Sequence, residues 1–329
     1  MSFLFLNRED VESLLPMADC IEVVAEALRT LARGDAVQPL RSALWMPDRH
    51  GLLVVMPGML GRAADGVAGA KVLTVVPDNF TRGEDSHQGL VLLFDQKQGR
   101  PLALFDAGAV TAIRTAAASA VATRALARQD AGDLAILGTG VQARSHLEAM
   151  RAVRTLRRVR VWSRNLDNAR RLAEEEGTRL GFAVEPVSTA REAVAGADLI
   201  CTVTAATAPV LLGDWISPGA HVNAVGACTP NARELDAAAV ARSRLFTDRK
   251  ESLFAEAGDF LLARAEGAVD DSHFQGELGD VLEAKVPGRR SDDEVTLFKS
   301  LGIAVEDLAA GRFMYAKALG AGKGTRLEL

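Results

Sequence analysis

The chain has 329 residues, of which 48% are hydrophobic and 25% charged, the composition of a soluble globular protein long enough for two domains. Its 38 basic and 43 acidic residues give a formal net charge of −5. The scattered acids and the scarce aromatic residues (12 Phe, 3 Trp and 1 Tyr) argue against a nucleic-acid-binding surface.

Targeting, membrane and metal-binding signals are missing from the sequence. The first ten residues, MSFLFLNRED, lack the basic start and long apolar core of a signal peptide, and no run approaches 18 uncharged apolar residues. Cys20, Cys201 and Cys228 form no CxxC pair, and the five histidines show no HxH or HxxxH spacing. We therefore expect a cytoplasmic protein without disulfides, bound metal or membrane contact.

The first third of the chain predicts a helix followed by a group of short strands. Residues 10–33 repeat apolar side chains with helical period, and Gly34 stands where a helix C-cap would fall. Turn sequences such as Pro77-Asp-Asn79 separate the apolar runs that follow, and closely spaced strands indicate an antiparallel or mixed sheet. The expected strands are 43–45, 51–57, 68–76, 90–95 and 103–106.

The pattern changes after residue 107, where an alanine-rich helix at 109–128 leads into alternating strands and helices. Such alternation indicates βαβ crossovers and a parallel sheet covered on both faces. Residues 295–319 are expected to form one amphipathic helical stretch with no strand after it, which could return to the first domain. The expected strands are 134–137, 159–162, 199–203, 221–225 and 244–247, and the expected helices are 141–154, 166–177, 190–195 and 234–241.

The strongest local motif is Asp133-Leu-Ala-Ile-Leu-Gly138-Thr-Gly140-Val-Gln-Ala143. An apolar strand leads directly into GxGxxA and then into a helix. Glycines at these positions permit a tight turn and let the backbone approach a pyrophosphate at the helix N-terminus. An ordinary strand–turn–helix is the alternative, but the strand before the motif and the helix after it favour dinucleotide binding.

The end of the second strand distinguishes NADP from NAD. Folds that prefer NAD usually place Asp or Glu there, roughly 20 residues after the glycine motif, to bind the ribose 2′-hydroxyl. Here Val159–Trp162 is followed by Ser163-Arg164-Asn165, with no acid. A hydroxyl and a guanidinium suit a 2′-phosphate, although Arg164 is one of 31 arginines in a chain with only 7 lysines. We expect NADPH, with NADH as the alternative.

Lys71 stands inside Val67–Val76, the most strand-like apolar run of the first domain. A buried ammonium requires an anionic partner or a catalytic role, and the alternative is an edge strand with one lysine on its solvent face. Arg41, before a strand, and Arg114, in a helix of small residues, are two further cations on uncharged segments. The three could converge on one small carboxylate, with an arginine binding it bidentately.

Six segments occur in the order seen in the ornithine cyclodeaminase/mu-crystallin family, which the chain resembles from about residue 5 to 318. Their combination is far more specific than GxGxxA alone. The segments are Gly69-Ala-Lys71, Ser86-His-Gln-Gly89, Arg114-Thr-Ala-Ala-Ala-Ser119, Gly138-Thr-Gly-Val-Gln-Ala-Arg144, Val225-Gly-Ala-Cys-Thr-Pro230 and Leu297-Phe-Lys-Ser-Leu-Gly302.

The resemblance implies an α/β fold in which a Rossmann-type parallel-sheet domain is inserted in a mixed α+β domain that binds substrate and dimerises. The substrate domain would comprise 1–118 and 303–329, and the Rossmann domain 119–302. The protein would then be a homodimer that binds a small imino or amino acid and a dinucleotide.

The resemblance also implies the roles of individual residues. Arg41, Lys71 and Arg114 would hold a substrate carboxylate beside the nicotinamide, with Cys228 and Thr229 also at the substrate site. The matching cofactor positions are Gly138, Gly140, Val141, Gln142, Ser163, Arg164, Thr202, Thr204, Val225, Ser300 and Leu301.

Cys228 marks a departure from true ornithine cyclodeaminases, which carry an aspartate at the matching position as acid and base. Ketimine reductases similar to mu-crystallin have a small polar residue there and a following Arg-Glu-Leu-Asp, matched here by Arg233–Asp236. The resemblance therefore implies NADPH-dependent reduction of Δ1-pyrroline-2-carboxylate or Δ1-piperideine-2-carboxylate to L-proline or L-pipecolate. Lys71 or a water would supply the proton. Cys228 is expected in the pocket wall, with a reactive thiol as the alternative.

Other functions stay open at this point. One is an ornithine cyclodeaminase or an alanine-dehydrogenase-like enzyme, and another is a non-enzymatic binding protein like mu-crystallin. The retained Lys71, Arg41 and Arg114 speak against a loss of catalysis. His87 either touches the substrate or is a hydrogen-bonded loop histidine, and His146, after the glycine motif, is expected to be structural.

Overall fold

The computed structural model describes residues 2–62 and 66–328, and the chain divides into two compact units. Unit 1 comprises Met1–Arg114 and Gly302–Leu329, so it contains both ends of the chain. Unit 2 is the continuous segment Thr115–Leu301.

The chain leaves unit 1 inside one helix and returns to it just before another. The helix at the first crossing is α3 (Ala107–Leu126), and the helix after the second crossing is α11 (Ala304–Ala321). The crossings fall after residues 114 and 301. The boundaries implied by the family resemblance are after residues 118 and 302.

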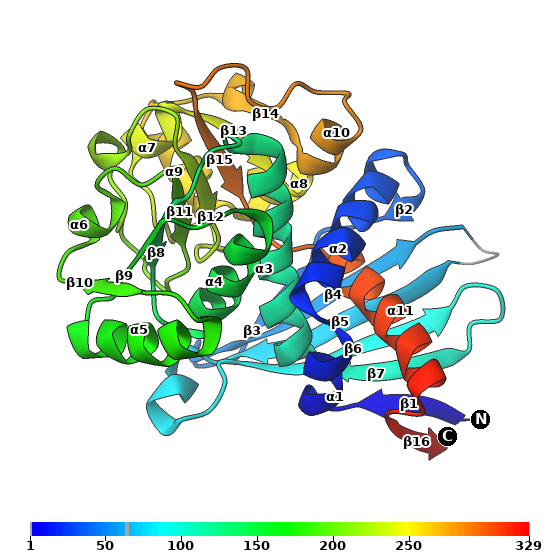
Figure 1. The fold of residues 1–329 in the computed structure, drawn as a ribbon. Coiled ribbons are helices and arrows are strands. Elements are labelled where there is room, and N and C mark those ends of the chain that lie inside the picture. The colour runs from blue at the N-terminus through cyan, green and yellow to red at the C-terminus, as the bar shows by residue number, and fades with distance from the viewer. Residues whose placement is uncertain (1, 63–65, 329) are drawn as a thin grey trace. The chain divides into compact units, whose positions relative to one another are not determined.

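Unit 1 is built on a mixed sheet of eight strands (Figure 1). Its order is β16-β1-β7-β6-β5-β4-β2, with β3 also paired to β4. Only β1 and β7 run parallel, which confirms the predicted mixed sheet. The strands are β1 (Ser2–Leu6), β2 (Ala36–Val37), β3 (Ser42–Trp45), β4 (Leu52–Leu60), β5 (Val67–Val75), β6 (His87–Asp95), β7 (Pro101–Asp106) and β16 (Thr325–Glu328).

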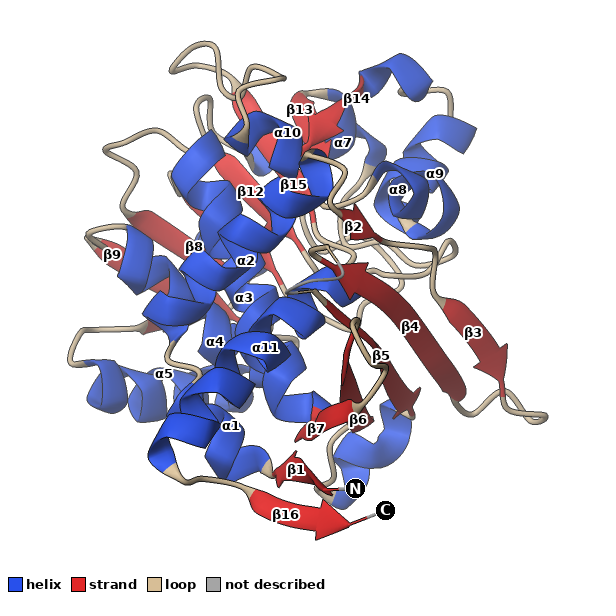
Figure 2. Cartoon of the chain, turned by 90° about the vertical axis from the view of Figure 1, so that its right-hand side faces the viewer, coloured by secondary structure: helices blue, strands red, loops and turns tan. Residues whose placement is uncertain are grey.

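Helices α1 (Arg8–Leu14), α2 (Met17–Ala32) and α11 pack on this sheet (Figure 2), and a 3-10 helix, η1 (Pro77–Arg82), joins β5 to β6. The single helix expected over 10–33 is wrong, because Pro16 separates α1 from α2 and forms the N-cap of α2. Proline has no amide hydrogen and its ring clashes with the preceding turn, so a new helix starts there.

The C-terminal tail also differs from its prediction as one helical stretch over 295–319. It contains a strand, β15 (Val295–Lys299), then α11, and finally β16, which pairs with β1. β15 is buried along its whole length between β12 and β13, and a short apolar run fits a buried strand and a buried helix equally well. All four residues of β16 are exposed, so no apolar alternation marks this strand in the sequence.

Unit 2 carries a second eight-stranded sheet, in the order β10-β9-β8-β11-β12-β15-β13-β14. All its strand pairs are parallel, which confirms the parallel sheet. Nearly every side chain of β8, β11, β12 and β15 is buried, as expected for a sheet covered on both faces. The strands before β15 are β8 (Asp133–Leu137), β9 (Arg158–Trp162), β10 (Glu185–Val187), β11 (Leu199–Thr202), β12 (His221–Ala224), β13 (Ser243–Thr247) and β14 (Phe274–Glu277).

Short helices connect these strands, and one of them differs from its prediction. The helix expected over 234–241 begins only at Ala237, because the Asp236 side chain accepts a hydrogen bond from the Ala239 amide and forms the N-cap. The helices are α4 (Val141–Val153), α5 (Leu166–Leu180), α6 (Ala190–Val194), α7 (Ala237–Ala241), α8 (Lys250–Glu256), α9 (Gly258–Ala265) and α10 (Leu278–Leu282), with 3-10 turns η2 (Gly213–Trp215) and η3 (Asp271–His273).

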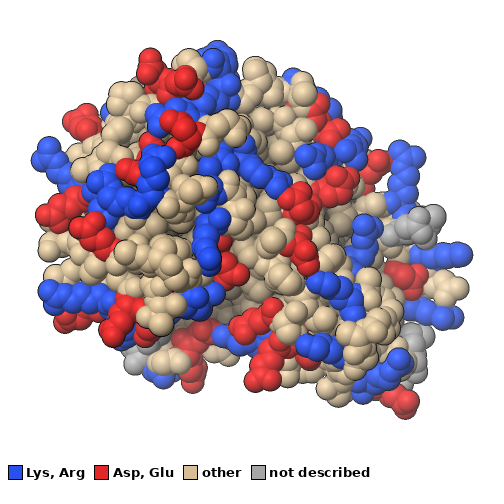
Figure 3. Space-filling model, in the orientation of Figure 1, with Lys and Arg blue, Asp and Glu red and all other residues tan. Residues whose placement is uncertain are grey.

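Charged side chains of both signs are interspersed over the face of the protein drawn in Figure 3. Large exposed apolar side chains occur in unit 1 on and near β2, β3 and β4, namely Val37, Leu40, Leu44, Trp45 and Met59. Among the described helices, none is both long enough and apolar enough to cross a membrane.

Candidate functional site

The glycine motif forms the turn between β8 and α4. Gly138 has a φ of +126°, and a Cβ on it would lie only 2.7 Å from the Val203 carbonyl oxygen, so no other residue fits there. Gly140 is the N-cap of α4, and a Cβ on it would meet nothing within 4 Å. Because glycine has no side chain to cap the helix, the first amides of α4 stay open to an anion such as a pyrophosphate.

The turn lies where the strand order of the sheet reverses. β8 pairs with β9 on one side and with β11 on the other: the chain runs outward from β8 to β9 and β10, then crosses back past β8 to β11. In parallel sheets, ligands bind outside the carboxyl ends of the strands at this switch point. The open cradle at Gly140 and its place in the sheet fit a dinucleotide.

The other predicted cofactor residues follow the carboxyl ends of neighbouring strands in the same sheet. Each strand end contributes one or two of these cofactor residues. Residues up to about 160 positions apart in the sequence therefore lie at the same edge of the sheet. Val141 and Gln142 follow β8, Ser163 and Arg164 follow β9, Thr202 and Thr204 lie at the end of β11, Val225 follows β12, and Ser300 and Leu301 follow β15.

Ser163 and Arg164 lie where the second strand ends. Ser163 is half-buried, and its hydroxyl accepts a weak hydrogen bond from the Asn165 amide at 3.4 Å. Arg164 is exposed, and none of the described carboxylates forms an ion pair with it. Its guanidinium is therefore available to a ligand.

Thr202 and Thr204 turn their hydroxyls to a buried carboxylate that the sequence had marked only as part of a motif. The Glu234 oxygens accept from the Thr202 hydroxyl at 2.8 Å and from the Thr204 hydroxyl at 2.7 Å. Thr202 and Glu234 are fully buried, whereas Thr204 is half-buried. The structure thus places Thr202 behind the edge of the site.

Ser300 and Leu301 are buried and held by backbone hydrogen bonds. The Ser300 amide donates to the Ala224 carbonyl at 3.0 Å, and the Leu301 amide donates to the Asp248 carboxylate at 2.7 Å. Because both bonds use the main chain, the path of this segment after β15 is fixed independently of its side chains.

His146 lies inside unit 2 behind the glycine turn. Its two ring nitrogens bond to the Gln142 carbonyl at 2.7 Å and to the Ser119 hydroxyl at 2.9 Å. Burial lowers the pKa of His146 to about 4, so the ring is neutral at physiological pH. It joins α4 to α3 as a structural residue.

The predicted cations of the first domain all belong to unit 1. Lys71 lies on β5, which pairs with β4 on one side and β6 on the other, and the residue is 1% exposed. The alternative of an edge strand with a solvent-facing lysine is therefore wrong. The Lys71 ammonium lies 2.8 Å from Oδ2 of Asp307 and 3.0 Å from its Oδ1, and it donates to the Thr111 hydroxyl at 3.3 Å.

Arg114 shares the same carboxylate. Its Nε donates to Oδ1 of Asp307 at 2.9 Å, and its Nη1 donates to Glu306 at 2.9 Å. The guanidinium packs closely over Gly302, where a Cβ would lie 2.5 Å from Nη1. Arg41 is half-buried and donates to the Gly302 carbonyl at 3.1 Å, so the cations meet around one turn of the chain.

The cluster brings three cations, Lys71, Arg114 and Arg41, together with the carboxylates of Glu306 and Asp307. Burial and the positive charge of Arg114 lower the pKa of Lys71 to about 8, although Asp307 acts in the opposite direction. Glu306 and Asp307 are fully buried, so no water screens these charges. Ammonium and guanidinium groups of this kind are the usual protein ligands of a small carboxylate.

Sequence reasoning missed Glu306 and Asp307. Both lie on α11, in a segment assigned only a helical period, and they contact Lys71 and Arg114 from about 190–240 positions away. The signal that could have found them is their place between apolar residues on both sides, because adjacent acids in an apolar helix need buried cations.

The remaining predicted substrate residues fall in different units. His87 begins β6 in unit 1, and its Nδ1 lies 2.9 Å from the Ser86 hydroxyl. His87 is exposed, and its pKa is lowered by desolvation and by the charges of Lys71 and Arg114. Cys228 and Thr229 belong to unit 2, where the half-buried Cys228 thiol donates to the Val225 carbonyl at 3.3 Å and Thr229 is exposed.

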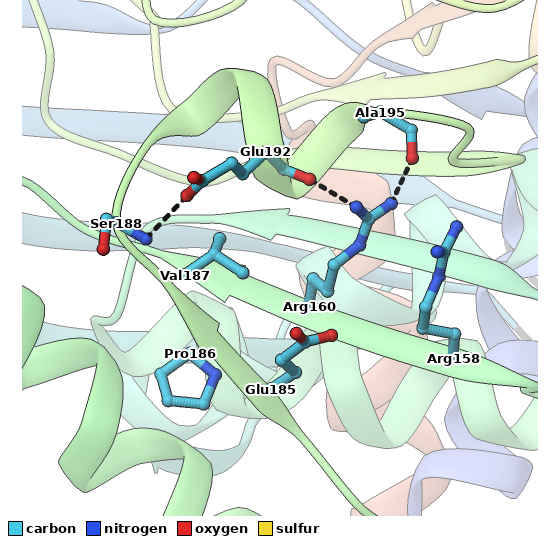
Figure 4. Close-up of a pocket in the computed structure, with 8 residues that line it drawn as sticks. All are labelled: Arg158, Arg160, Glu185, Pro186, Val187, Ser188, Glu192 and Ala195. Carbon is cyan, nitrogen blue, oxygen red and sulfur yellow. Dashed lines mark hydrogen bonds between the residues drawn. The ribbon is translucent and has the colours of Figure 1, made fainter.

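A cavity of about 490 Å³ lies elsewhere, beside β9, β10 and α6 (Figure 4). Its walls are formed by residues of β9, by the whole of β10 and by α6, and no residue of the glycine turn lines it. Arg160 points to the end of α6, where it donates to the carbonyls of Glu192 and Ala195. These bonds cap a helix, and this cavity is not the candidate site.

Comparison with known proteins agrees with this geometry. Residues 1–322 match the sequence model of the ornithine cyclodeaminase/mu-crystallin family. A Δ1-pyrroline-2-carboxylate reductase of Bacillus cereus is 35% identical over 328 residues, 99% of each chain. The ketimine reductase mu-crystallin of Mus musculus is 38% identical over 315 residues, 94% of this chain and 96% of the other.

Two solved structures are similar over nearly the whole chain. Thermococcus litoralis Δ1-pyrroline-2-carboxylate reductase, in complex with NADH and L-proline, has a TM-score of 0.95 at 39% identity and covers 98% of this chain and 99% of its own. An archaeal alanine dehydrogenase dimer with bound NAD has a TM-score of 0.93 at 31% identity and covers 100% of both chains.

Proposed function

The chain belongs to the ornithine cyclodeaminase/mu-crystallin family, and on this premise we propose that it reduces a cyclic imino acid with a nicotinamide cofactor. The substrate would be Δ1-pyrroline-2-carboxylate or Δ1-piperideine-2-carboxylate, and the product L-proline or L-pipecolate. Relatives named for such reactions support this choice. The observation that carries it is the cluster in which Lys71, Arg114 and the half-buried Arg41 come together beside Asp307 and Gly302.

The cluster suits a carboxylate because it brings an ammonium and two guanidinium groups together. Asp307 and Glu306 hold Lys71 and Arg114 in place before any ligand arrives, so little reorganisation accompanies binding. In both cyclic imino acids the carboxylate is attached to the imine carbon. Holding the carboxylate therefore also positions the carbon that is reduced.

Lys71 is the proposed proton donor. Imine reduction adds a hydride to carbon and a proton to nitrogen, and the bound cofactor supplies the hydride. With a pKa of about 8, Lys71 carries its proton at neutral pH and can release it to the more basic amine nitrogen. Asp307 holds the ammonium at this position.

The preferred cofactor is NADPH, on the argument from Ser163 and Arg164. An exposed arginine without a carboxylate partner among the described residues suits a 2′-phosphate, and the second strand ends without an acid for a ribose hydroxyl. Relatives crystallised with NADH and NAD support a nicotinamide cofactor of either kind.

Oxidation of NADPH with five- and six-membered cyclic imino acids in parallel tests the function, with NADH run alongside. Lys71→Ala should lose most activity while the Kd of NADPH changes little, and Lys97→Ala, an exposed lysine of the same unit, is the matched control. Wild-type turnover in Lys71→Ala would contradict the assignment. Ammonia release from ornithine with catalytic NAD would indicate a cyclodeaminase, and inactivity with every imino acid a binding protein.

We also infer that the protein acts as a homodimer. The apolar side chains of Val37, Leu40, Leu44, Trp45 and Met59 are each at least 45% exposed in the single chain. Grouped exposed apolar side chains are typical of protein interfaces. The dimeric state of the similar alanine dehydrogenase supports the inference.

A further inference from the structure

Glu234 is a fully buried carboxylate whose two oxygens each receive two hydrogen bonds. Oε1 accepts from the Thr204 amide at 2.6 Å and from the Thr204 hydroxyl at 2.7 Å. Oε2 accepts from the Gly226 amide at 2.7 Å and from the Thr202 hydroxyl at 2.8 Å. One side chain therefore ties together the segments that follow β11 and β12.

The segments after β11 and β12 are in direct contact through their backbones at Gly226. A Cβ on Gly226 would overlap the Thr204 carbonyl oxygen and lie 2.7 Å from the Glu234 carboxylate. The residue between the two threonines, Val203, presents the carbonyl that lies 2.7 Å from a Cβ built on Gly138. The position of the glycine turn thus depends on a backbone segment that Glu234 holds.

The charge of Glu234 is part of a second buried cluster. Asp259, from α9, accepts from the amides of Glu234 and Leu235 at 2.7 and 2.9 Å, and pairs with the buried Lys299 of β15 at 2.9 Å. Burial and Asp259 raise the pKa of Glu234, whereas Lys299 and the bonds from Thr204 lower it. The arrangement fixes the main chain on both sides of the Glu234 carboxylate.

We propose that Glu234 is a positioning residue for the dinucleotide site, acting through the segments Thr202–Thr204 and Gly226 that it joins behind the glycine turn. The inference rests on the cofactor site of the proposed function but not on imine reduction. Nothing on Glu234 need touch the cofactor, because all four bonds of its carboxylate are made within the protein.

The geometry requires a carboxylate at this position and rejects an amide. Each oxygen faces one backbone N–H, from Thr204 or from Gly226, and a backbone amide cannot accept a hydrogen bond. In Glu234→Gln the new NH₂ group faces one of these two amides in either orientation. The substitution keeps the volume of the side chain and removes the support of one segment.

The test measures the Kd of NADPH and NADH by fluorescence titration of the folded protein, without imino acid. Glu234→Gln should raise the Kd by about tenfold or more, and raise the KM of the cofactor more than the KM of the imino acid. Glu176→Gln is the matched control, a 3% exposed glutamate of α5 paired with Arg144 and Arg179. Wild-type cofactor affinity in folded Glu234→Gln would overturn the proposal.

Thr202→Val keeps the test decisive if Glu234→Gln does not fold. This nearly isosteric change removes one donor to Oε2, so the Kd of the cofactor should rise by a few-fold, and an unchanged Kd would contradict the inference. Where both variants fold, their effects should be less than additive in the double variant, because each acts through the same bond. Additive effects would contradict action through Thr202.

The outcomes separate this inference from the proposed reaction. A protein that binds the cofactor through Glu234 but reduces no imino acid would keep the inference and reject the reaction. If the wild-type protein reduces imino acids and the Glu234→Gln variant binds the cofactor as tightly as wild type, the reaction is supported and the role of Glu234 is rejected. A wild-type protein that binds neither NADPH nor NADH would reject both.

Discussion

Asp307 lies against Lys71 through both of its carboxylate oxygens, at 2.8 and 3.0 Å, and both residues are buried. The same Oδ1 also accepts from Arg114, so one acid on α11 holds two cations of the sheet and of α3. Removing one partner of a buried ion pair typically costs about 3–5 kcal/mol, because the other charge is left unpaired. Lys71 is therefore held in one position.

Asp307→Asn should move the alkaline limit of activity to lower pH. Asp307 raises the pKa of Lys71, whose value is about 8 in the intact cluster, so its removal lowers that pKa. In the proposed reaction the protonated lysine is the proton donor, so activity should be lost as pH rises through its pKa. A profile of kcat against pH should show this limb shifted down by about one to three pH units.

Glu306→Gln is the matched control for Asp307→Asn. Glu306 pairs with Arg114, so its loss should raise the KM of the imino acid while the alkaline limb stays near its wild-type position. Equal shifts of the limb in the two variants would show that general loss of charge, and not contact with Lys71, sets the pH limit.

Two alanine substitutions in the glycine turn should have different effects. Gly138→Ala places a Cβ 2.7 Å from the Val203 carbonyl at a positive φ, and we expect it to lower the free energy of unfolding by about 1–3 kcal/mol. Gly140→Ala meets nothing within 4 Å, so thermal unfolding of the free protein should hardly change. Its Cβ should instead raise the Kd of the dinucleotide, as measured by fluorescence titration.

The contrast between the two glycines is the informative result. If Gly140→Ala bound the dinucleotide like wild type while remaining folded, the open cradle at the start of α4 would not be the pyrophosphate site. Equal losses of stability in both variants would contradict the packing of Gly138 against Val203.

Arg164→Ser should reduce the preference for NADPH over NADH without affecting stability. The guanidinium is exposed and pairs with no described carboxylate, so its removal breaks no internal ion pair. The ratio of kcat/KM for the two cofactors should fall by about tenfold, through a higher KM for NADPH. Arg171→Ser, on the exposed face of α5, is the control, and an unchanged ratio in Arg164→Ser would remove the argument for NADPH.

Leu44→Glu should convert a dimer to a monomer. Leu44 is 63% exposed on β3, so a charge there costs the single chain little, whereas it would be buried at an interface. Light scattering coupled to size exclusion measures the mass directly. Leu319→Glu, a leucine 53% exposed on α11, is the control, and a dimer that persists in Leu44→Glu would place the interface elsewhere.

The sequence predicted those features that are local. Gly138 and Gly140 can be recognised as a dinucleotide-binding motif from the strand before them and the helix after them. The alternation of strands and helices predicts a parallel sheet without knowledge of any long-range contact. The same holds for β3 to β7 of the mixed sheet, in which consecutive strands of the chain pair with one another.

The features that sequence reasoning missed depend on contacts between distant segments. Lys71 and Asp307 are 236 positions apart: the apolar surroundings of each indicate a partner of opposite charge, but they do not identify which residue it is. Three cations without acids nearby suggested a purely external anion, whereas the chain itself supplies two of the acids. β16 was not predicted for the same reason: it is an exposed edge strand, recognisable by its pairing with β1 and not by an apolar pattern in its own sequence.

The division of unit 1 between the two ends of the chain has a consequence for synthesis. Asp307 is translated long after Lys71, and the whole of unit 2 lies between them. Until the segment that forms α11 and β16 has been synthesised, β5 carries an ammonium without its counter-ion, and β1 lacks its partner β16. Unit 1 can therefore be completed only after the whole of unit 2 has been synthesised, when α11 supplies the two acids.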